Sequence, residues 1–227
     1  LDELFQLFVK SMARAQLLEA VQALHRRSLI ERGQKPGSFT LQSVVLEYAT
    51  AHLVEIIGHE IQQGKWHYLI EYGLELGQVR EFVRQTQVRL IVAPILAGLK
   101  DQFQGKPEVL DHLTAALDWL RNQVDMIQGY APANVLALIQ ARQGHLRGVD
   151  LSQLSIRGAY LQGVLMQDAS LAGATLQASV FTETFDAIYY VAVSSNGEFW
   201  AASSQSGEIR LWLAGEQTLL RMWQAHT

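Results

Sequence analysis

The sequence predicts a mixed α+β protein of several domains, in which a helical first part is followed by a coiled β-solenoid and then by a β-meander. Three observations predict this order. Helical patterns of apolar residues fill most of 1–144, a five-residue apolar repeat runs through 145–184, and short alternating strands separated by Asn-Gly and Ser-Gly turns fill 185–227. A chain of 227 residues that is 49% hydrophobic can bury more than one core.

Composition excludes several classes of protein. Eighteen Lys and Arg against 22 Asp and Glu give a net charge of −4, so no overall field favours nucleic acid or an anionic membrane. There is no cysteine, which rules out disulfides and fits the cytoplasmic location that we expect. The longest apolar run, 90–99, is too short to span a bilayer, and no secretory signal is present. The chain opens within a helical pattern and without Met, so we interpret it as a fragment of a longer protein.

Residues 1–64 predict two helices, a hairpin and a long helix. The turn 33–37 is rich in Gly and Pro and separates two short strands. The apolar side of the opening helix comprises Leu1, Leu4, Phe5, Phe8 and Val9. The inner side of the long helix is predicted to comprise Val45, Tyr48, Ala49, Leu53 and Ile56. This order indicates a winged helix that lacks its first helix.

Two functions are open to such a domain. DNA binding would use 13–27 as the recognition helix, but 1–64 holds six Lys or Arg and seven Asp or Glu, which disfavours nucleic acid as a partner. The second function comes from resemblance. The runs 17–31 and 39–48 resemble the winged-helix segment that follows the NB-ARC nucleotide-binding domain in signal-transduction ATPases of the STAND class.

That resemblance implies a nucleotide-binding domain upstream, where ATP or ADP and Mg would bind; no cofactor is expected within these 227 residues. In the family, a Met-His-Asp motif locks the ADP-bound state through its histidine. The matching positions here are Leu41, Gln42 and Ser43, so the resemblance makes Gln42 the candidate nucleotide-sensing residue. Its side-chain amide could still donate a hydrogen bond.

Residues 65–144 are predicted to form a helical connector, with helices expected near 66–76, 78–103, 107–128 and 132–143. A stripe of Leu110, Leu113, Leu117 and Leu120, with Trp119 beside it, predicts helix-on-helix packing. This region is similar to the helices between the winged helix and the sensor domain of the same ATPases.

Residues 145–184 carry large apolar residues at a spacing of five, a period that fits neither a helix nor a flat strand. The chain must therefore turn a corner every five residues, which predicts a square solenoid with these side chains stacked inside. They are Leu146, Leu151, Ile156, Leu161, Met166, Leu171, Leu176 and Phe181. The segment resembles a pentapeptide-repeat coil, and we expect the helices to cap one of its ends and the following blade the other.

Residues 185–227 predict four short antiparallel strands. The runs 191–197 and 209–212 resemble the first blade of a WD-repeat propeller, although Leu213 replaces the Asp of the Trp-Asp pair. Thr184 and Ser206 fall where that family has its structural His and Asp, and Ser204 and Trp212 are expected to keep part of the network. Because one blade cannot stand alone, further blades of the propeller are expected partners.

The sequence holds no catalytic constellation. It lacks the Gly-x-x-x-x-Gly-Lys phosphate loop and the Gly-x-Ser-x-Gly elbow, so no enzyme activity is expected in these residues. His52, Glu55 and His59 could share a helical side and hold zinc, but interior or interface histidines are the favoured interpretation, and no metal site is predicted. Trp119, Trp200, Trp212 and Trp223 are expected to be core residues.

The resulting hypothesis is a non-catalytic regulatory and sensor portion of a STAND-type ATPase. A protein or ligand bound at the propeller would release an autoinhibited state, in which the chain contacts its own nucleotide-binding domain, and would lead to homo-oligomerisation. The alternatives are a DNA-binding winged-helix regulator and a passive scaffold.

Overall fold

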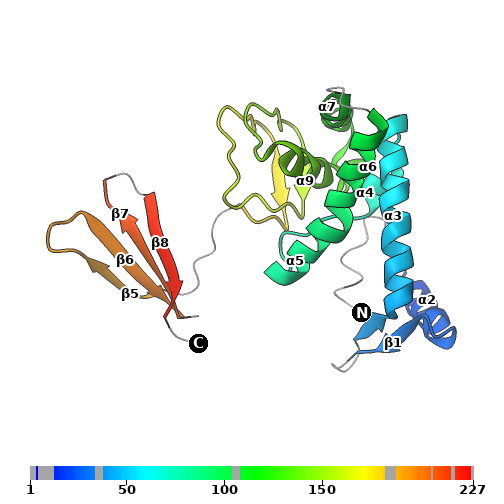
Figure 1. Cartoon of the computed structure of the whole chain (residues 1–227), viewed down its shortest axis with the longest axis horizontal. Helices are drawn as coiled ribbons and strands as arrows, with labels where there is room; N and C mark the ends of the chain where they lie inside the picture. The colour runs from blue at the N-terminus through cyan, green and yellow to red at the C-terminus, as the bar shows by residue number, and fades with distance from the viewer. Residues whose placement is uncertain are drawn as a thin grey trace. The chain divides into compact units, whose positions relative to one another are not determined.

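The computed structural model describes residue 4 and residues 13–33, 38–103, 108–181, 188–205, 207–215 and 218–225. The chain forms two compact units, Leu1–Phe181 and Thr182–Thr227, and each is described by itself. Helices and three small sheets make up the described residues, so the predicted mixed α+β class is confirmed (Figure 1). Three of the four predicted regions lie within the first unit, and their division into domains stays a prediction.

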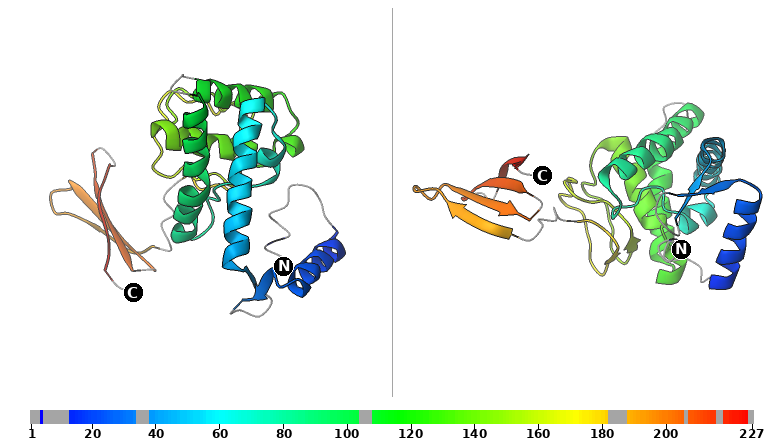
Figure 2. Two further views of the ribbon diagram at one scale, coloured as in Figure 1. Left: turned by 45° about the vertical axis from the view of Figure 1, so that its right-hand side comes forward. Right: turned by 90° about the horizontal axis from the view of Figure 1, so that it is seen from below.

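The first unit opens with helix α2 (Arg14–Arg26), strands β1 (Ile30–Arg32) and β2 (Phe39–Leu41), and helix α3 (Ser43–Gln63). The strands form an antiparallel hairpin in which Ile30 lies opposite Leu41. Figure 2 shows α3 leading from this hairpin to the remaining helices. The opening helix predicted for the first nine residues lies outside the described residues except for Leu4, which is helical.

The predicted inner side of α3 is partly wrong. Tyr48 is 70% exposed, and Ala49 is exposed as well. The buried residues of the helix are Ile57, Glu60 and Ile61, all in its second half. The reason is tertiary: only the second half enters the main core, while the first half connects that core to the hairpin.

Seven helical segments follow. They are α4 (His67–Glu71), α5 (Glu81–Gln87), η1 (Val88–Val92), α6 (Ala93–Phe103), α7 (Glu108–Arg121), α8 (Asp125–Gln128) and α9 (Ala131–Gln143). The segments α5, η1 and α6 are continuous, as the pattern over 78–103 predicted, but η1 is a π-helical turn. Helix α9 is almost entirely buried and packs against α4, α7 and strand β3 of the coil.

Two buried polar side chains hold the start of this helical region in place. Glu60 on α3 accepts hydrogen bonds from the backbone N–H groups of His67, Tyr68 and Leu69, at 3.0, 2.8 and 2.9 Å. These are donors that the first turn of α4 cannot satisfy within the helix. Asn134 on α9 makes three further hydrogen bonds to the backbone of 69–74.

Residues 146–181 form a coil of parallel turns. Strands β3 (Ser155–Arg157) and β4 (Thr175–Gln177) pair in parallel, with Ile156 opposite Leu176, so successive turns are 176 − 156 = 20 residues apart. Backbone hydrogen bonds repeat at about that interval, as from Leu151 N–H to Ser170 O at 2.8 Å. Four five-residue repeats therefore make one turn.

The corners of the coil explain the period of five. A residue with positive φ stands at every fifth position of the coil: Gly148, Gln153, Gly158, Gly163, Asp168, Gly173 and Ala178. The left-handed conformation bends the chain at each corner. The repeat residue lies three positions after each corner. The bend turns its side chain toward the interior of the coil.

Burial of the repeat residues falls along the coil. Leu146, Leu151 and Ile156 are fully buried and Leu161 is 3% exposed, whereas Met166 and Leu171 are half-buried. Leu176 and Phe181 are 45% and 43% exposed, so the expectation that all eight residues lie inside is wrong for these two. Within the described residues, helices cover the first turn of the coil, but no further turn stacks on the second.

Polar contacts join the helices to the first turn. Gln128 accepts a hydrogen bond from Ser155 N–H at 2.7 Å, and Arg121 donates to the carbonyl groups of Asp150 and Ser152. Gly77 N–H donates to Gly158 O at 2.7 Å, an approach so close that a Cβ on Gly77 would lie 2.5 Å from Ala159 O. The helices thus cap one end of the coil, while the cap expected from the blade stays a prediction.

A cluster of charged side chains also joins the helices to the first turn of the coil. The Arg84 guanidinium lies over the ring of Tyr160 at 3.8 Å and bonds to Glu75 and Glu81. Burial raises the pKa of Glu75 above its ordinary value, while the hydrogen bond from Arg84 lowers the pKa of Glu81. The charged, planar guanidinium of Arg84 thereby connects α5 to the coil: it pairs with the two carboxylates and stacks on the ring of Tyr160.

The second unit is a four-stranded antiparallel meander, as the sequence predicts. Its strands are β5 (Ile188–Val193), β6 (Phe199–Ser204), β7 (Glu208–Leu213) and β8 (Thr218–Gln224), in that spatial order. The predicted Asn-Gly turn joins β5 to β6: Gly197 has φ of 73°, and Asn196 Oδ1 accepts from Ser194 Oγ at 2.6 Å. None of the described helices in either unit is long and apolar enough to cross a bilayer.

Candidate protein-interaction face

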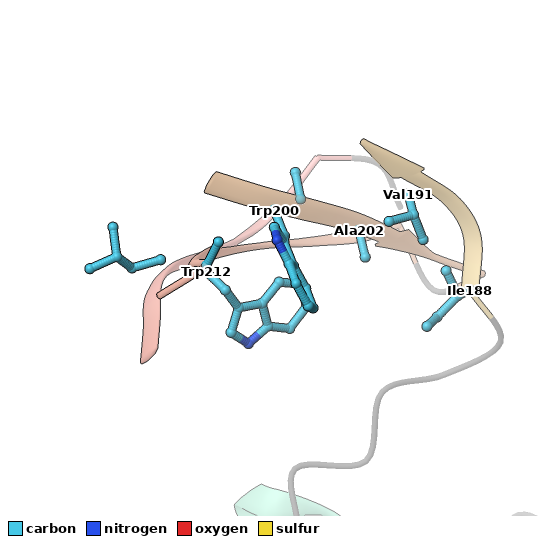
Figure 3. A pocket seen from close by; sticks show the side chains of 8 residues that line it. Ile188, Val191, Trp200, Ala202 and Trp212 are labelled. Carbon is cyan, nitrogen blue, oxygen red and sulfur yellow. The ribbon is translucent and has the colours of Figure 1, made fainter. Parts of the chain in front are cut away.

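One face of the meander gathers large apolar side chains. Trp200 on β6 lies opposite Val193 on β5 and Trp212 on β7, and directly opposed residues of paired strands share a face. Figure 3 shows the two indole rings on one side of the sheet, with Val191, Ala202 and Ile188 beside them. These five labelled residues, which we call the tryptophan face, line an open cavity of about 560 Å³.

The tryptophan face is exposed to an unusual extent for apolar side chains. Ile188, Val191 and Trp200 are 53%, 65% and 46% exposed, and only Ala202 is buried. A contiguous exposed apolar patch of this kind marks a surface that another structural element covers. The shallow cavity beside the indole rings is suited to side chains of such an element.

The opposite face of the same sheet is also apolar. Alternation along the strands places Tyr190, Ala192, Phe199, Ile209 and Leu211 there, with Ser203 among them. A sheet that covers one core alternates apolar with polar residues, whereas this sheet has apolar residues on both faces. Each face of this sheet is therefore expected to pack against another structural element.

Hydrogen bonds between polar side chains and the backbone stabilise the turn between β6 and β7. Ser204 is 5% exposed, and its Oγ accepts a hydrogen bond from Glu208 N–H at 3.3 Å. Arg210, also 5% exposed, donates from Nε to the Glu208 carboxylate. Ser204 thus stabilises this turn, and Trp212 belongs to the tryptophan face; the expectation that the two keep part of the WD-repeat hydrogen-bond network stays a prediction. Thr184 and Ser206 lie outside the described residues.

Gln42 lies immediately before α3 and joins that helix to the hairpin. Its Nε2 donates to Glu31 Oε1 on β1 at 3.2 Å, and its backbone N–H lies 3.4 Å from Leu29 O. This geometry gives Gln42 a local structural contact. Its part in sensing a nucleotide stays a proposal.

The His52, Glu55 and His59 set is not an interior cluster. His52 Nδ1 and Glu55 Oε2 are 4.0 Å apart, with 54% and 69% of their side chains exposed, and His59 is exposed as well. Of the two favoured interpretations, interior or interface histidines, the interior one is wrong because α3 buries the side that carries Ile57 and Ile61, and the interface one stays a prediction. Across the part of the chain that the structure describes, no group of three His, Cys, Asp or Glu residues could hold a metal ion.

The tryptophans also differ from expectation. Trp119, Trp200 and Trp223 are 41%, 46% and 43% exposed, although core positions were predicted. Trp119 lies on the side of α7 away from its buried residues Leu113, Leu117 and Leu120, while Trp200 and Trp223 lie on opposite faces of the meander. Sequence reasoning missed the two-faced character of the meander; apolar residues at both odd and even positions of 188–193 were the signal.

No family description matches the chain, and no solved structure matches it. Over 260 aligned positions the chain is 32% identical to an uncharacterized WD repeat-containing protein of Nostoc sp. strain PCC 7120. The match covers the whole chain but spans only 20% of the length of that relative. It supports WD-repeat character and is consistent with a propeller blade in β5–β8.

Proposed function

We propose that this chain is a non-catalytic protein-interaction and regulatory segment, in which β5–β8 form one blade of a propeller. The observation that carries the proposal is the meander with apolar residues on both faces. Blades of a propeller are packed between two other blades, which accounts for apolar side chains on both sides. The similarity to a WD repeat-containing protein supports the same assignment.

A blade without neighbours is expected to be much less stable than the first unit. In hydrogen exchange of the 227-residue chain, the amides of β5–β8 should exchange within about a factor of ten of unfolded-chain rates. Amides of α9, which is buried in the first unit, should be strongly protected and serve as the internal control. A longer natural protein that includes this chain should protect both sets. Equal, strong protection of β5–β8 in the 227-residue chain would exclude the blade.

A finer proposal follows from the resemblance to STAND-class ATPases. The chain would then transmit a change at the propeller to a nucleotide-binding domain elsewhere in the protein, where ATP or ADP and Mg bind, and so control homo-oligomerisation in the cytoplasm. The order α2, β1, β2, α3 supports the winged-helix assignment, and the coil supports a pentapeptide-repeat origin. Helix α3 connects the hairpin to the core that covers the coil, which provides a mechanical link within the first unit.

This coupling has a direct test in the full-length protein. Removal of the propeller should change the rate of ADP release by about fivefold or more, since typical coupling free energies produce effects of that size. Gln42→Ala should change the same rate if its amide approaches the nucleotide, while His52→Ala, an exposed change on α3, should not. Identical ADP release with and without the propeller would contradict the coupling and leave the interaction role untouched.

A further inference from the structure

The second turn of the coil has an open edge at strand β4. One side of β4 pairs with β3, and no strand among the described residues pairs with its other side. Leu176 at the centre of β4 is 45% exposed, whereas Ile156, which lies opposite it in the first turn, is fully buried. An edge strand with an exposed apolar residue is a template for pairing with another chain segment.

The hydrogen bonds between the two turns show which backbone groups the open edge offers. The N–H groups of Gln153 and Gly158, on either side of β3, donate to carbonyl groups of the second turn at 3.0 and 2.8 Å. Twenty residues further on, the equivalent N–H groups are those of Gly173 and Ala178, on either side of β4. Neither of these N–H groups has an acceptor within the described residues. They are therefore placed to donate to the carbonyl groups of a third parallel strand.

The coil of this chain does not continue over β4. With 20 residues in a turn, the segment that would pair with Thr175–Gln177 is 195–197. Those residues instead belong to the turn between β5 and β6, where Gly197 N–H donates to Ser194 O at 2.8 Å. A strand that pairs with the open side of β4 must therefore come from outside the coil.

The charge of the second turn indicates what kind of segment fits. Asp168 is the single Asp, Glu, Lys or Arg in 165–181, whereas the first turn, 145–164, carries Arg147, Asp150 and Arg157. Charged side chains on an edge strand oppose pairing, and β4 and its immediate neighbours carry none. An uncharged segment with a large apolar side chain over Leu176 is the complementary occupant.

A second copy of the same edge is a poorer occupant, because the edge offers more donors than acceptors. Apart from the pairing within β3 and β4, six N–H groups of the first turn donate to the second turn, and three N–H groups of the second turn donate back. The equivalent groups of the second turn have the same excess of N–H donors. Two identical edges would therefore bury N–H groups without acceptors, which opposes their association.

We propose that the open side of β4 binds an extended, uncharged apolar segment of a partner protein, which pairs with β4 in parallel as a third layer of the coil. Carbonyl groups of the segment accept from Gly173 and Ala178 N–H, and one of its apolar side chains covers Leu176. In strand addition of this kind, main-chain hydrogen bonds provide affinity and side-chain contacts provide specificity. The inference rests on the coil alone and does not depend on the blade assignment.

The test uses the whole 227-residue chain and a fluorescently labelled synthetic peptide with the sequence of residues 165–181. This probe is chosen because the second turn already stacks on the first with the register that a third layer needs. Binding is measured by fluorescence anisotropy, and Leu176→Lys in the chain is expected to weaken it about tenfold or more, because it places a charge on the pairing edge. Leu165→Lys is the matched control: Leu165 is also 45% exposed, but its carbonyl is already bonded to Leu146 N–H. A change below about twofold is expected for this control.

Amide hydrogen exchange of the unaltered chain, followed by nuclear magnetic resonance, gives a readout that does not depend on the folding of a variant. With saturating peptide, the amides of Gly173, Leu176 and Ala178 should exchange about tenfold more slowly, while those of α2 should not change. Absence of peptide binding, or equal weakening by Leu176→Lys and Leu165→Lys, would overturn the proposal. Self-association of the chain alone that Leu176→Lys abolishes would assign the edge to a second copy and would also overturn it.

Discussion

Asn134→Ala is expected to lower the free energy of unfolding of the first unit by about 3 kcal/mol, since it removes three hydrogen bonds to backbone groups, two of them buried. Asn134 is 1% exposed. Its Oδ1 accepts from Leu74 N–H at 2.8 Å, and its Nδ2 donates to the carbonyl oxygens of Leu69 and Tyr72 at 2.8 and 2.6 Å. Helix α4 ends at Glu71, with a last helical bond from Tyr72 N–H to Tyr68 O, and the bonds of Asn134 hold the chain in place beyond that end.

Urea unfolding followed by far-ultraviolet circular dichroism measures this change, because all described helices belong to the first unit. Gln140→Ala is the matched control: it truncates a half-buried amide side chain on the same helix, and a loss below about 1 kcal/mol is expected. If Asn134→Ala and Gln140→Ala destabilise the protein equally, the three hydrogen bonds do not stabilise the fold as described.

The coil offers the second large effect, because the same Leu→Ala substitution can be made at a repeat position in each of its two turns. Leu151→Ala, at a fully buried position in the first turn, is expected to reduce the free energy of unfolding by about 3 kcal/mol through lost burial and a cavity. Leu176→Ala, at a position 45% exposed in the second turn, is expected to reduce it by about 1 kcal/mol or less. Urea midpoints of the two variants give the comparison.

The pair also tests whether the open end of the coil is covered in solution. Similar losses for Leu151→Ala and Leu176→Ala would show that another element buries Leu176, contrary to the exposure seen in the described residues. Val164, half-buried against the core, provides an intermediate reference through Val164→Ala. A graded series from Leu151 through Val164 to Leu176 is the expected outcome.

The second unit was largely predictable from the sequence because its signals are local. Asn196-Gly197 specifies a tight turn, and alternating residues specify strands, so strand order follows from short connections. The exposure of Trp200 and Trp223 was not predictable in the same way. Their residue type indicates burial, but burial requires neighbours that the strand pattern of one meander does not supply.

The packing of the helical region was much less predictable from the sequence. Its helices were anticipated from apolar spacing, yet Tyr48 was assigned to the wrong side of α3, and the roles of Glu60 and Asn134 were not foreseen. The hydrogen bonds of Asn134 join residues about 60 positions apart in sequence, as for Leu74 and Asn134. Such contacts depend on how α9 lies against the start of the region, and no local pattern encodes that placement.

By itself the sequence determined that 146–181 turns a corner every five residues, because the repeat has a period that only a coiled backbone can satisfy. It also determined the meander, through turn chemistry and alternation. Only the tertiary structure decided which repeat residues are buried, that Leu176 and Phe181 are exposed, and that Tyr48 on α3 faces solvent. The physical reason is that periodicity states which side chains share a face, whereas burial depends on what packs against that face.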